Sequence, residues 1–294
     1  MYQRILVPLD GSRAAEVVLP YAEEIVTKTG AEIILVSVSE TKTTDIDHLY
    51  RSYLERVTEQ VHDRLKSYGA KETKVRTKVL IGKPANEIVS CADENDVDLI
   101  ALASHGGSAQ GSWLLGAIAG RVLRVAARPV LLVRTPASAT ARKEKRLVKK
   151  ILVPLDGSKA GESALPCLEM LAPSLGAELV LFQVVRPITV WAGVEGGAAY
   201  VVPQDEDTLK SSALEYLNGI GKQLQEKGLR TSSIVVLGAP AEQILDYAAS
   251  NTIDLIAMAT HGRSGIGRWV FGSVTDKILH AGDTAVLVVR SVKT

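Results

Sequence analysis

The chain has 294 residues, of which 46% are hydrophobic and 23% are charged, and its formal net charge at pH 7 is +1. This length and composition predict two globular domains, each with a substantial core. The near-neutral charge argues against a general polyanion-binding surface, so nucleic acid is not an expected partner.

Cysteine content and the N-terminal sequence bear on the compartment. Cys91 and Cys167 lie far apart in segments with helical patterning, which predicts packed thiols and a reducing environment. The start MYQRILVPLD has neither a basic n-region nor a long apolar core, so no secretion signal is expected. Arginines interrupt the longest apolar stretch, 113–133, so no membrane span is expected. The prediction is a cytoplasmic protein.

The first half contains five short apolar runs that are typical of strands. They are ILVPL at 5–9, EIILVSV at 32–38, KVRTKVL at 74–80, DLIALA at 98–103 and PVLLVR at 129–134. Amphipathic segments lie between them, and one has the helical apolar pattern Tyr50, Leu54, Val57, Val61, Leu65 and Tyr68. Strands that alternate with helices indicate a parallel sheet, and continuous hydrophobicity indicates burial of both its faces.

The second half repeats the first. ILVPLDGS at 5–12 recurs unchanged at 151–158, and DLIALASHG at 98–106 recurs as DLIAMATHG at 254–262. The spacing between the two motifs is about ten residues longer in the second half, and we expect the insertion at 186–207, a predicted loop containing glycine, alanine and proline.

These patterns predict an α/β fold of two tandem, doubly wound domains, each with a five-stranded parallel sheet. The first domain is predicted at 1–135, a linker at 136–148 and the second domain at 149–294. Basic residues gather towards the end of the linker region. They fit either a solvated charge run or a contact for an acidic partner.

A binding site is predicted at the same place in each half. Ligands of open parallel sheets bind beyond the carboxyl ends of strands where the strand order reverses. The first strand of each half ends in Leu-Asp-Gly-Ser, at 9–12 and 155–158, and the fourth strand ends at 103–106 or 259–262. We expect these two strands to be neighbours, so that their end loops line one crevice.

The loop after the fourth strand of the second half, MATHGRSGIGRWVFGS at 258–273, is rich in glycine and leads into an amphipathic helix that should end near Gly282. Helix-start amides beside glycines form a typical anion site, to which Ser273 would add a hydroxyl. Alternatively, Ser273 is an N-cap helped by Asp276. A Walker A loop is excluded, because Arg268 and Trp269 stand where Lys and Ser or Thr are required.

With these motifs, the chain resembles the universal stress protein family in its tandem two-domain form, over nearly the whole of both halves. In nucleotide-binding members, the loop after the fourth strand has a glycine, two residues, a glycine, nine residues and then Gly-Ser or Gly-Thr. The second half has Ala259 in the first place, Gly262 in the second and Gly272-Ser273 at the close. It therefore departs from the family pattern at one position.

The first half departs from the same pattern at two positions. Ala103 replaces the first glycine and Ala117 replaces the hydroxyl residue, whereas Gly106 and Gly116 are kept. The resemblance therefore implies that the second half binds nucleotide more tightly than the first.

The resemblance implies Rossmann-like domains, similar to those of adenine nucleotide alpha hydrolases, that bind ATP or a related adenine nucleotide, with Mg²⁺ as a candidate companion. Phosphates would lie on the loop amides and the closing hydroxyl, the aspartate near the adenosine and the valine against the adenine. The implied residues of the second half are Pro154, Leu155, Asp156, Val184, Ala259, His261, Gly262, Arg263, Gly272, Ser273 and Val274. The equivalents in the first half are Pro8, Leu9, Asp10, Val38, Ala103, His105, Gly106, Gly116, Ala117 and Ile118.

Residues typical of catalysis are few. His105 and His261 have no partners at metal-ligand spacing, so we interpret them as residues that orient the loop, and no metal site is assigned. Asp10 and Asp156 fit either a ribose or Mg²⁺ contact or an ordinary Asp-Gly-Ser turn. No catalytic residue is assigned, and any ATP hydrolysis is expected to be slow.

Two classes of function stay open. One is a stress-response or regulatory module that binds an adenine nucleotide, favoured by the glycines and serine of the second half. The other is a dimerising stress protein that acts through protein contacts alone, favoured by the alanine replacements. The resemblance also implies pairing through the apolar edge strands at 129–134 and 285–290, between the two halves or between two chains, and a homodimer is predicted.

Overall fold

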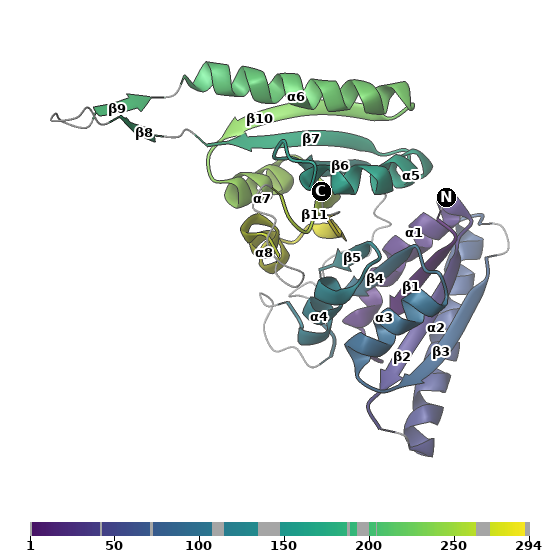
Figure 1. The fold of residues 1–294 in the computed structure, drawn as a ribbon. Coiled ribbons are helices and arrows are strands. Elements are labelled where there is room, and N and C mark those ends of the chain that lie inside the picture. The colour runs from purple at the N-terminus through teal and green to yellow at the C-terminus, as the bar shows by residue number, and fades with distance from the viewer. Residues whose placement is uncertain are drawn as a thin grey trace.

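The computed structural model describes residues 2–41, 43–70, 73–107, 115–134, 148–186, 189–192, 200–203, 205–262 and 271–291. Within these residues, a ten-stranded sheet runs through both halves in the order β10-β7-β6-β11-β12-β5-β4-β1-β2-β3 (Figure 1). Five parallel strands come from each half, so the predicted α/β fold of two tandem doubly wound domains is confirmed.

The elements follow the predicted alternation of strand and helix. The first half contains β1 (Arg4–Pro8), α1 (Leu19–Thr29), β2 (Glu32–Ser39), α2 (Thr44–Ser67), β3 (Val75–Ile81), α3 (Pro84–Glu94), β4 (Leu99–Ala103), α4 (Ala117–Val125) and β5 (Val130–Val133). The second half contains β6 (Lys150–Pro154), α5 (Leu165–Leu175), β7 (Glu178–Val185), β8 (Thr189–Ala192), β9 (Tyr200–Pro203), α6 (Glu206–Glu226), β10 (Arg230–Leu237), α7 (Pro240–Ser250), β11 (Leu255–Ala259), α8 (Ser273–His280) and β12 (Ala285–Val289).

Local sequence explains several of the helix boundaries. Proline lies in the first turn of α1, α3, α5 and α7, where its missing N–H breaks no helical hydrogen bond. Gly30 and Gly176 end α1 and α5 in the left-handed conformation, with φ of 73° and 63°, which a glycine adopts without strain.

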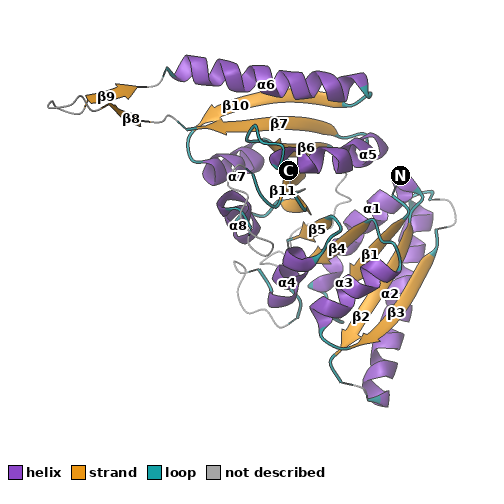
Figure 2. Ribbon diagram, in the orientation of Figure 1, coloured by secondary structure: helices purple, strands orange, loops and turns teal. Residues whose placement is uncertain are grey.

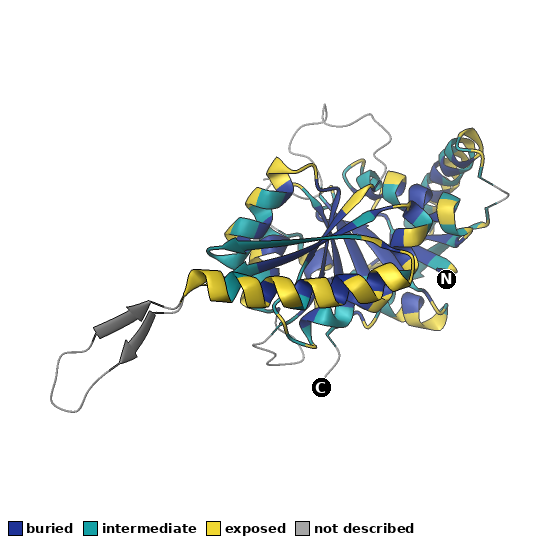
Figure 3. Ribbon diagram, turned by 90° about the horizontal axis from the view of Figure 1, so that it is seen from above, coloured by how far each residue is buried: buried dark blue, intermediate teal, exposed yellow. Residues whose placement is uncertain are grey.

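Each face of the sheet carries its own core, and each core continues through both halves. One core joins the inner faces of α1, α2, α5 and α6, and the other joins α3, α4, α7 and α8. Alternating residues of β1 divide between them, because Ile5 and Val7 face the first and Leu6 faces the second. Figure 3 shows the buried strands at the centre and the exposed outer side of α6. The predicted burial of both sheet faces is therefore confirmed.

The two halves pair with each other through their edge strands. β5 and β12 are antiparallel, with Leu131 opposite Leu287 and Leu132 opposite Val286. The sequence left open whether these edge strands pair between the two halves or between two chains, and the structure shows pairing between the halves. The apolar edges are thus covered within a single chain, which removes an exposed template for aggregation.

A helix contact reinforces this strand pairing. Helix α1 packs against α5, and the Tyr2 hydroxyl lies 2.7 Å from the Cys167 sulfur. Near the same contact, the Glu24 carboxylate of α1 accepts a hydrogen bond from the backbone N–H of Val148, with N–O distances of 3.0 and 3.2 Å. Both predicted packing thiols, Cys91 and Cys167, are buried and free.

The insertion at 186–207 was predicted to be a loop, and that prediction is wrong. It contains the antiparallel strands β8 and β9, with Val190 opposite Val202. β-Branched and aromatic residues on both sides of its glycines favour strands over irregular structure. Figures 1 and 2 show this hairpin extending away from the body, beyond the end of β7 and the start of α6.

Candidate functional site

The strand order places the predicted sites at two equivalent switch points. β1 lies between β2 and β4, and β6 lies between β7 and β11. The chain leaves β1 towards β2 and later returns to β4 on the other side, so the loops after β1 and β4 are neighbours. The same holds for the loops after β6 and β11.

In the first half, one carboxylate joins the two loops. Asp10 Oδ1 accepts hydrogen bonds from the backbone N–H of Ser12 at 3.0 Å and from its hydroxyl at 2.6 Å. Asp10 Oδ2 accepts a bond from the N–H of Gly107 at 2.9 Å, across 97 residues of sequence. Asp10 therefore forms the predicted Asp-Gly-Ser turn and also holds the loop after β4, while its contact with a ribose or Mg²⁺ stays a prediction.

The second half repeats this arrangement. Asp156 Oδ1 accepts bonds from the N–H and the hydroxyl of Ser158 at 3.0 and 2.6 Å. A Cβ at Gly262 would lie 2.0 Å from Asp156 Oδ2, and a Cβ at Gly106 would lie 1.9 Å from Asp10 Oδ2. Both loop glycines are thus required by the close approach of the carboxylate.

The helices after these loops begin alike. Gly116 and Gly272 are the N-cap residues of α4 and α8, and their N–H groups donate to the Ser104 and Thr260 carbonyls at 2.9 and 3.0 Å. The N-cap alternative for Ser273 is wrong, because Ser273 is the first helical residue. An added Cβ at Gly116 would lie only 2.9 Å from the Ser104 carbonyl oxygen, whereas at Gly272 the nearest atom would be 3.6 Å away.

Ser273 presents a hydroxyl where the first half has only a methyl group. Ser273 is exposed and forms no hydrogen bond with the described residues. Its counterpart Ala117 is also exposed, and beside it Ile118 is 46% exposed. The start of α8 is therefore more polar than the start of α4.

The alanines at the first motif position fit the backbone. Ala103 and Ala259 are the last residues of β4 and β11, and both are buried. Among the described residues, only Asp96 and Thr252 combine a side chain with a positive φ. The alanines therefore carry no backbone strain, and the Ala259 carbonyl accepts a hydrogen bond from the Thr275 hydroxyl at 3.1 Å.

Each of the two loop histidines contacts the hydroxyl of the residue that precedes it. His105 Nδ1 is 3.0 Å from the Ser104 hydroxyl, and His261 Nδ1 is 3.2 Å from the Thr260 hydroxyl. Burial, and secondly the charge of Arg134, lower the pKa of His105. Within the described part of the chain, Nε2 of His261 is buried and has no hydrogen-bond partner.

Ser291, which lies after β12, holds the backbone of His261 by hydrogen bonds. The N–H of His261 donates to the Ser291 hydroxyl at 2.9 Å, and that hydroxyl donates to the His261 carbonyl at 3.0 Å. The loop after β11 is thereby tied to the residues that follow β12. These bonds involve only the backbone of His261, so the loop-orienting role of its side chain stays a prediction.

The remaining predicted residues line up at the same end of the sheet. Pro154 pairs with Phe182, which brings Val184, two residues further along β7, level with Asp156. Val38 has the same relation to Asp10, because Pro8 pairs with Val36. Val38 and Val184 are partly exposed.

Three further predicted residues have other surroundings. The side chains of Leu9 and Leu155 are buried in the core, so only their backbones face the loops. Val274 is partly exposed at the start of α8. Arg263 lies outside the described residues.

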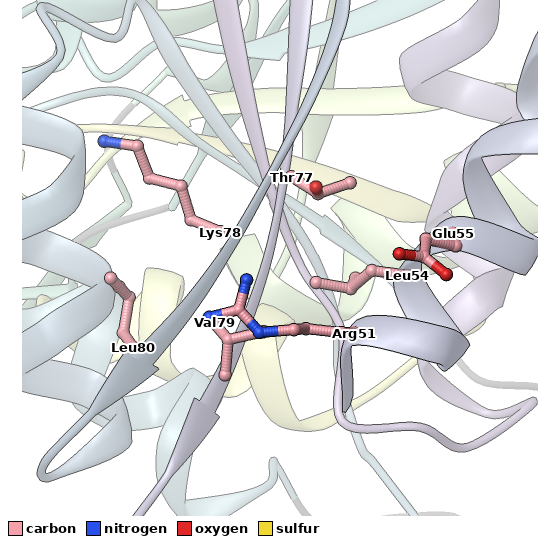
Figure 4. A pocket seen from close by; sticks show the side chains of 7 residues that line it. All are labelled: Arg51, Leu54, Glu55, Thr77, Lys78, Val79 and Leu80. Carbon is pink, nitrogen blue, oxygen red and sulfur yellow. The ribbon is translucent and has the colours of Figure 1, made fainter. Parts of the chain in front are cut away.

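A separate hollow lies at the open edge of the sheet. It measures about 310 Å³ and is formed by α2 and the edge strand β3. Figure 4 shows Lys78 directed away from Arg51. Arg51 Nε is 2.7 Å from Asp47, and Lys78 donates to the neutral Asn95 side chain at 2.8 Å, so both basic side chains of this hollow already have partners.

Other features bear on binding. In the described ranges, no group of three His, Cys, Asp or Glu residues could hold a metal ion. None of the helices in the same ranges is both long and apolar enough to cross a membrane.

Sequence reasoning missed Arg134 as a residue near the sites. It directly follows β5 and donates to carbonyls at the end of α8, 144 and 147 residues later in the chain. The sequence signal was limited to an arginine that follows each of the two apolar edge strands.

Comparison with known proteins identifies relatives of similar length. The universal stress protein Slr1230 of Synechocystis is 26% identical over 315 residues, covering 98% of this chain and 100% of its own. The crystal structure of a universal stress protein from Archaeoglobus fulgidus has 22% identity and a TM-score of 0.70, with 98% of each chain covered. That likeness establishes the fold.

A universal stress protein solved in complex with cAMP is 26% identical and covers 46% of this chain and 98% of its own, with a TM-score of 0.36. The model of the universal stress protein family matches this chain twice, at residues 1–134 and 148–290. Two matches that together span most of the sequence agree with the repeated fold, and the chain belongs to the universal stress protein family.

Proposed function

We propose that this protein is a stress-response or regulatory module that binds ATP or a related adenine nucleotide, mainly in its second half. The observation that carries the proposal is the meeting of three features at one switch point: the Asp156 carboxylate, the close approach of Gly262 and the free hydroxyl of Ser273.

The start of α8 suits a phosphate group. The first amides of a helix have no intrahelical acceptor and lie at the positive end of the helix dipole. Gly272 has no side chain with which to cap them, and the exposed Ser273 hydroxyl lies at the first helical position. This combination supports binding of a phosphate by backbone N–H groups and one hydroxyl.

The remainder of the nucleotide would extend towards β7. Asp156 would lie near the ribose and Val184 against the adenine, in line with the register of β6 and β7. Both Oδ1 contacts of Asp156 are made to Ser158, which fixes the carboxylate before a ligand arrives. Preorganisation of this kind reduces the entropic cost of binding.

The first half is proposed to bind more weakly. Its loops have the same carboxylate and the same close glycine, but Ala117 and Ile118 stand where the second half has Ser273 and Val274. A phosphate at α4 would therefore meet backbone amides without a hydroxyl.

Partners and compartment are also part of the proposal. We keep the prediction of a homodimer without nucleic acid or membrane partners, in the cytoplasm. Since β5 and β12 already pair within one chain, a homodimer would use another surface. Light scattering coupled to gel filtration measures whether the mass is that of one chain or two.

The alternative function is a dimerising stress protein that binds no nucleotide. Thermal unfolding with and without millimolar Mg-ATP separates the two functions, because a ligand at 100 times its Kd stabilises the folded state by about 2.7 kcal/mol. Nucleotide released from the purified protein by denaturation would be a second positive result. Unchanged unfolding together with no released nucleotide would favour the alternative.

A further inference from the structure

We propose that Arg134, which belongs to the first half, is a positioning residue for the nucleotide site of the second half. This inference rests on the proposed function and goes further: it assigns part of the second site to a residue outside its own domain.

The contact is made at the end of α8 that is opposite to the proposed phosphate site. Arg134 Nη2 donates to the Ile278 carbonyl at 2.6 Å and to the Ala281 carbonyl at 3.1 Å. The last carbonyls of a helix have no intrahelical donor and carry the negative end of its dipole. A guanidinium satisfies both needs, since it supplies several fixed donors and a permanent charge.

Arg134 is partly withdrawn from solvent at this contact. Burial lowers the pKa of Arg134, and the nearby charge of Asp283 acts in the opposite direction. A cation withdrawn from water is costly unless it is paired. The α8 carbonyls compensate for part of this cost at Nη2, whereas Nε is buried without a hydrogen-bond partner among the described residues.

Helix α8 is short enough to transmit this constraint. It has eight residues, about 12 Å in length, with the Arg134 contact at one end and Gly272-Ser273 at the other. Between them, the buried Thr275 hydroxyl binds the Ala259 carbonyl, which fixes the helix to the end of β11. A shift or tilt at the last turn would therefore reorient the amides of the first turn.

The origin of Arg134 makes the second site dependent on the pairing of the halves. Arg134 follows directly after β5, which is hydrogen-bonded to β12. Its charge also acts on His105, in the loop after β4 of the first half. One side chain therefore lies between the loop of one site and the helix of the other.

Site-resolved NMR titration of the full chain with Mg-ATP tests the inference. The amide signals of Gly272 and Ser273 report on the second site in the wild type, Arg134→Gln and Arg134→Lys. We expect Arg134→Gln to weaken binding at the second site by about five-fold or more, and Arg134→Lys to restore most of it, because a cation at the helix end is kept. The matched control is Arg128→Gln, which removes a first-half arginine that lies 3.5 Å from Asp93.

The wild-type protein supplies an independent measurement. The side-chain Nε–H signal of Arg134 should shift with the same apparent Kd as the Gly272 amide, even if Arg134→Gln does not fold. Equal affinity in the wild type and Arg134→Gln, or an Arg134 signal that ATP leaves unchanged, would overturn the positioning role. If the wild-type amides do not respond to millimolar Mg-ATP, the proposed function itself fails.

Discussion

Gly106 and Gly262 lie beside the aspartates that follow β1 and β6, and the reason for glycine there is space. Neither has a positive φ, yet an added Cβ would stand within 2.0 Å of a carboxylate oxygen. The aspartate would have to move, and in the first half the bond from the Gly107 amide to Asp10 would be lost. A substitution at either glycine should therefore affect stability, and it should also disturb the proposed nucleotide site.

Replacing Gly262 by alanine should lower the free energy of unfolding by about 1–3 kcal/mol, as overpacking does elsewhere, and should abolish ATP binding in the second half. Urea unfolding and calorimetric titration measure the two effects. Gly219→Ala is the control: nothing lies within 4 Å of its added Cβ in α6, so this variant should gain about 0.5–1 kcal/mol. A Gly262→Ala protein as stable as the wild type would contradict the steric argument.

For single residues, contacts within a short stretch of sequence were predictable, and contacts with distant parts of the chain were not. The Asp-Gly-Ser turn at Asp10 follows from three adjacent residues. The N-cap was misplaced by one residue at Ser273, because serine is a preferred cap residue and its preference does not show that the cap lies at Gly272, whose N–H donates to the Thr260 carbonyl. Arg134 was missed because its acceptors belong to the other domain.

Helices α4 and α8 are equivalent elements that differ at their starts. Both begin after a glycine N-cap that is bonded to the loop after the fourth strand of its half. They differ in the first residue, which is Ala117 in α4 and Ser273 in α8. The proposed difference in affinity between the two halves is therefore concentrated at one exchangeable position.

Exchanging these residues should exchange the affinities. Ser273→Ala should weaken ATP binding at α8 by about ten-fold, and Ala117→Ser should strengthen it at α4 by a similar factor, since a hydrogen bond to a charged group contributes about 1.5 kcal/mol or more. NMR titration followed at Gly116 and Gly272 resolves the two sites. Ser250→Ala, an exposed change at the end of α7, should alter neither. Unchanged affinities in both variants would remove the hydroxyl from the proposed site.

Elements with a clear apolar pattern were predicted well. In α2, the buried residues are Leu54, Val57, Val61 and Leu65, all members of the predicted apolar stripe. The β8–β9 hairpin was missed because glycine, alanine and proline in the segment indicate a loop, whereas the strands depend on pairing of residues 8 to 14 positions apart.

On the scale of the molecule, the interface between the halves contains a buried acid. Glu24, on α1, is 6% exposed and accepts the Val148 amide where the chain enters β6. Burial raises the pKa of Glu24 to about 7, and the charge of Asp254 acts in the same direction, while the Val148 bond, Lys149 and Lys28 oppose it. In the equivalent position of the second half stands the exposed Met170.

Stability should therefore depend on pH through Glu24. The ordinary pKa of the carboxyl is 4.5, so its favourable contribution is complete below that pH and is lost as pH rises through about 7. Relative to Glu24→Gln, the wild type should lose up to about 3 kcal/mol between pH 5 and 8. Urea unfolding at intervals of one pH unit measures the difference. Glu226→Gln, an exposed change at the end of α6, controls for the lost charge. Parallel profiles for the wild type and Glu24→Gln would rule out this role.

The repeat predicted the architecture of the whole, because two copies of one strand–helix pattern require two copies of one sheet. It did not predict which partner covers the edge strands. The structure shows that the two edge strands cover each other, with Leu131 opposite Leu287 in antiparallel register. Likewise, the Tyr2–Cys167 contact joins residues 165 positions apart and has no local signature.

The β5–β12 junction also has a consequence for how this molecule can vary. Were the same interface formed by two identical chains, each substitution would occur twice, once on either side of the twofold axis. Within one continuous polypeptide, Ser273 can face solvent while its counterpart is Ala117, and Glu24 can be enclosed while Met170 is not. Because the two halves are covalently joined, one half can specialise while the other supports it. Their pairing also does not weaken when the protein is diluted.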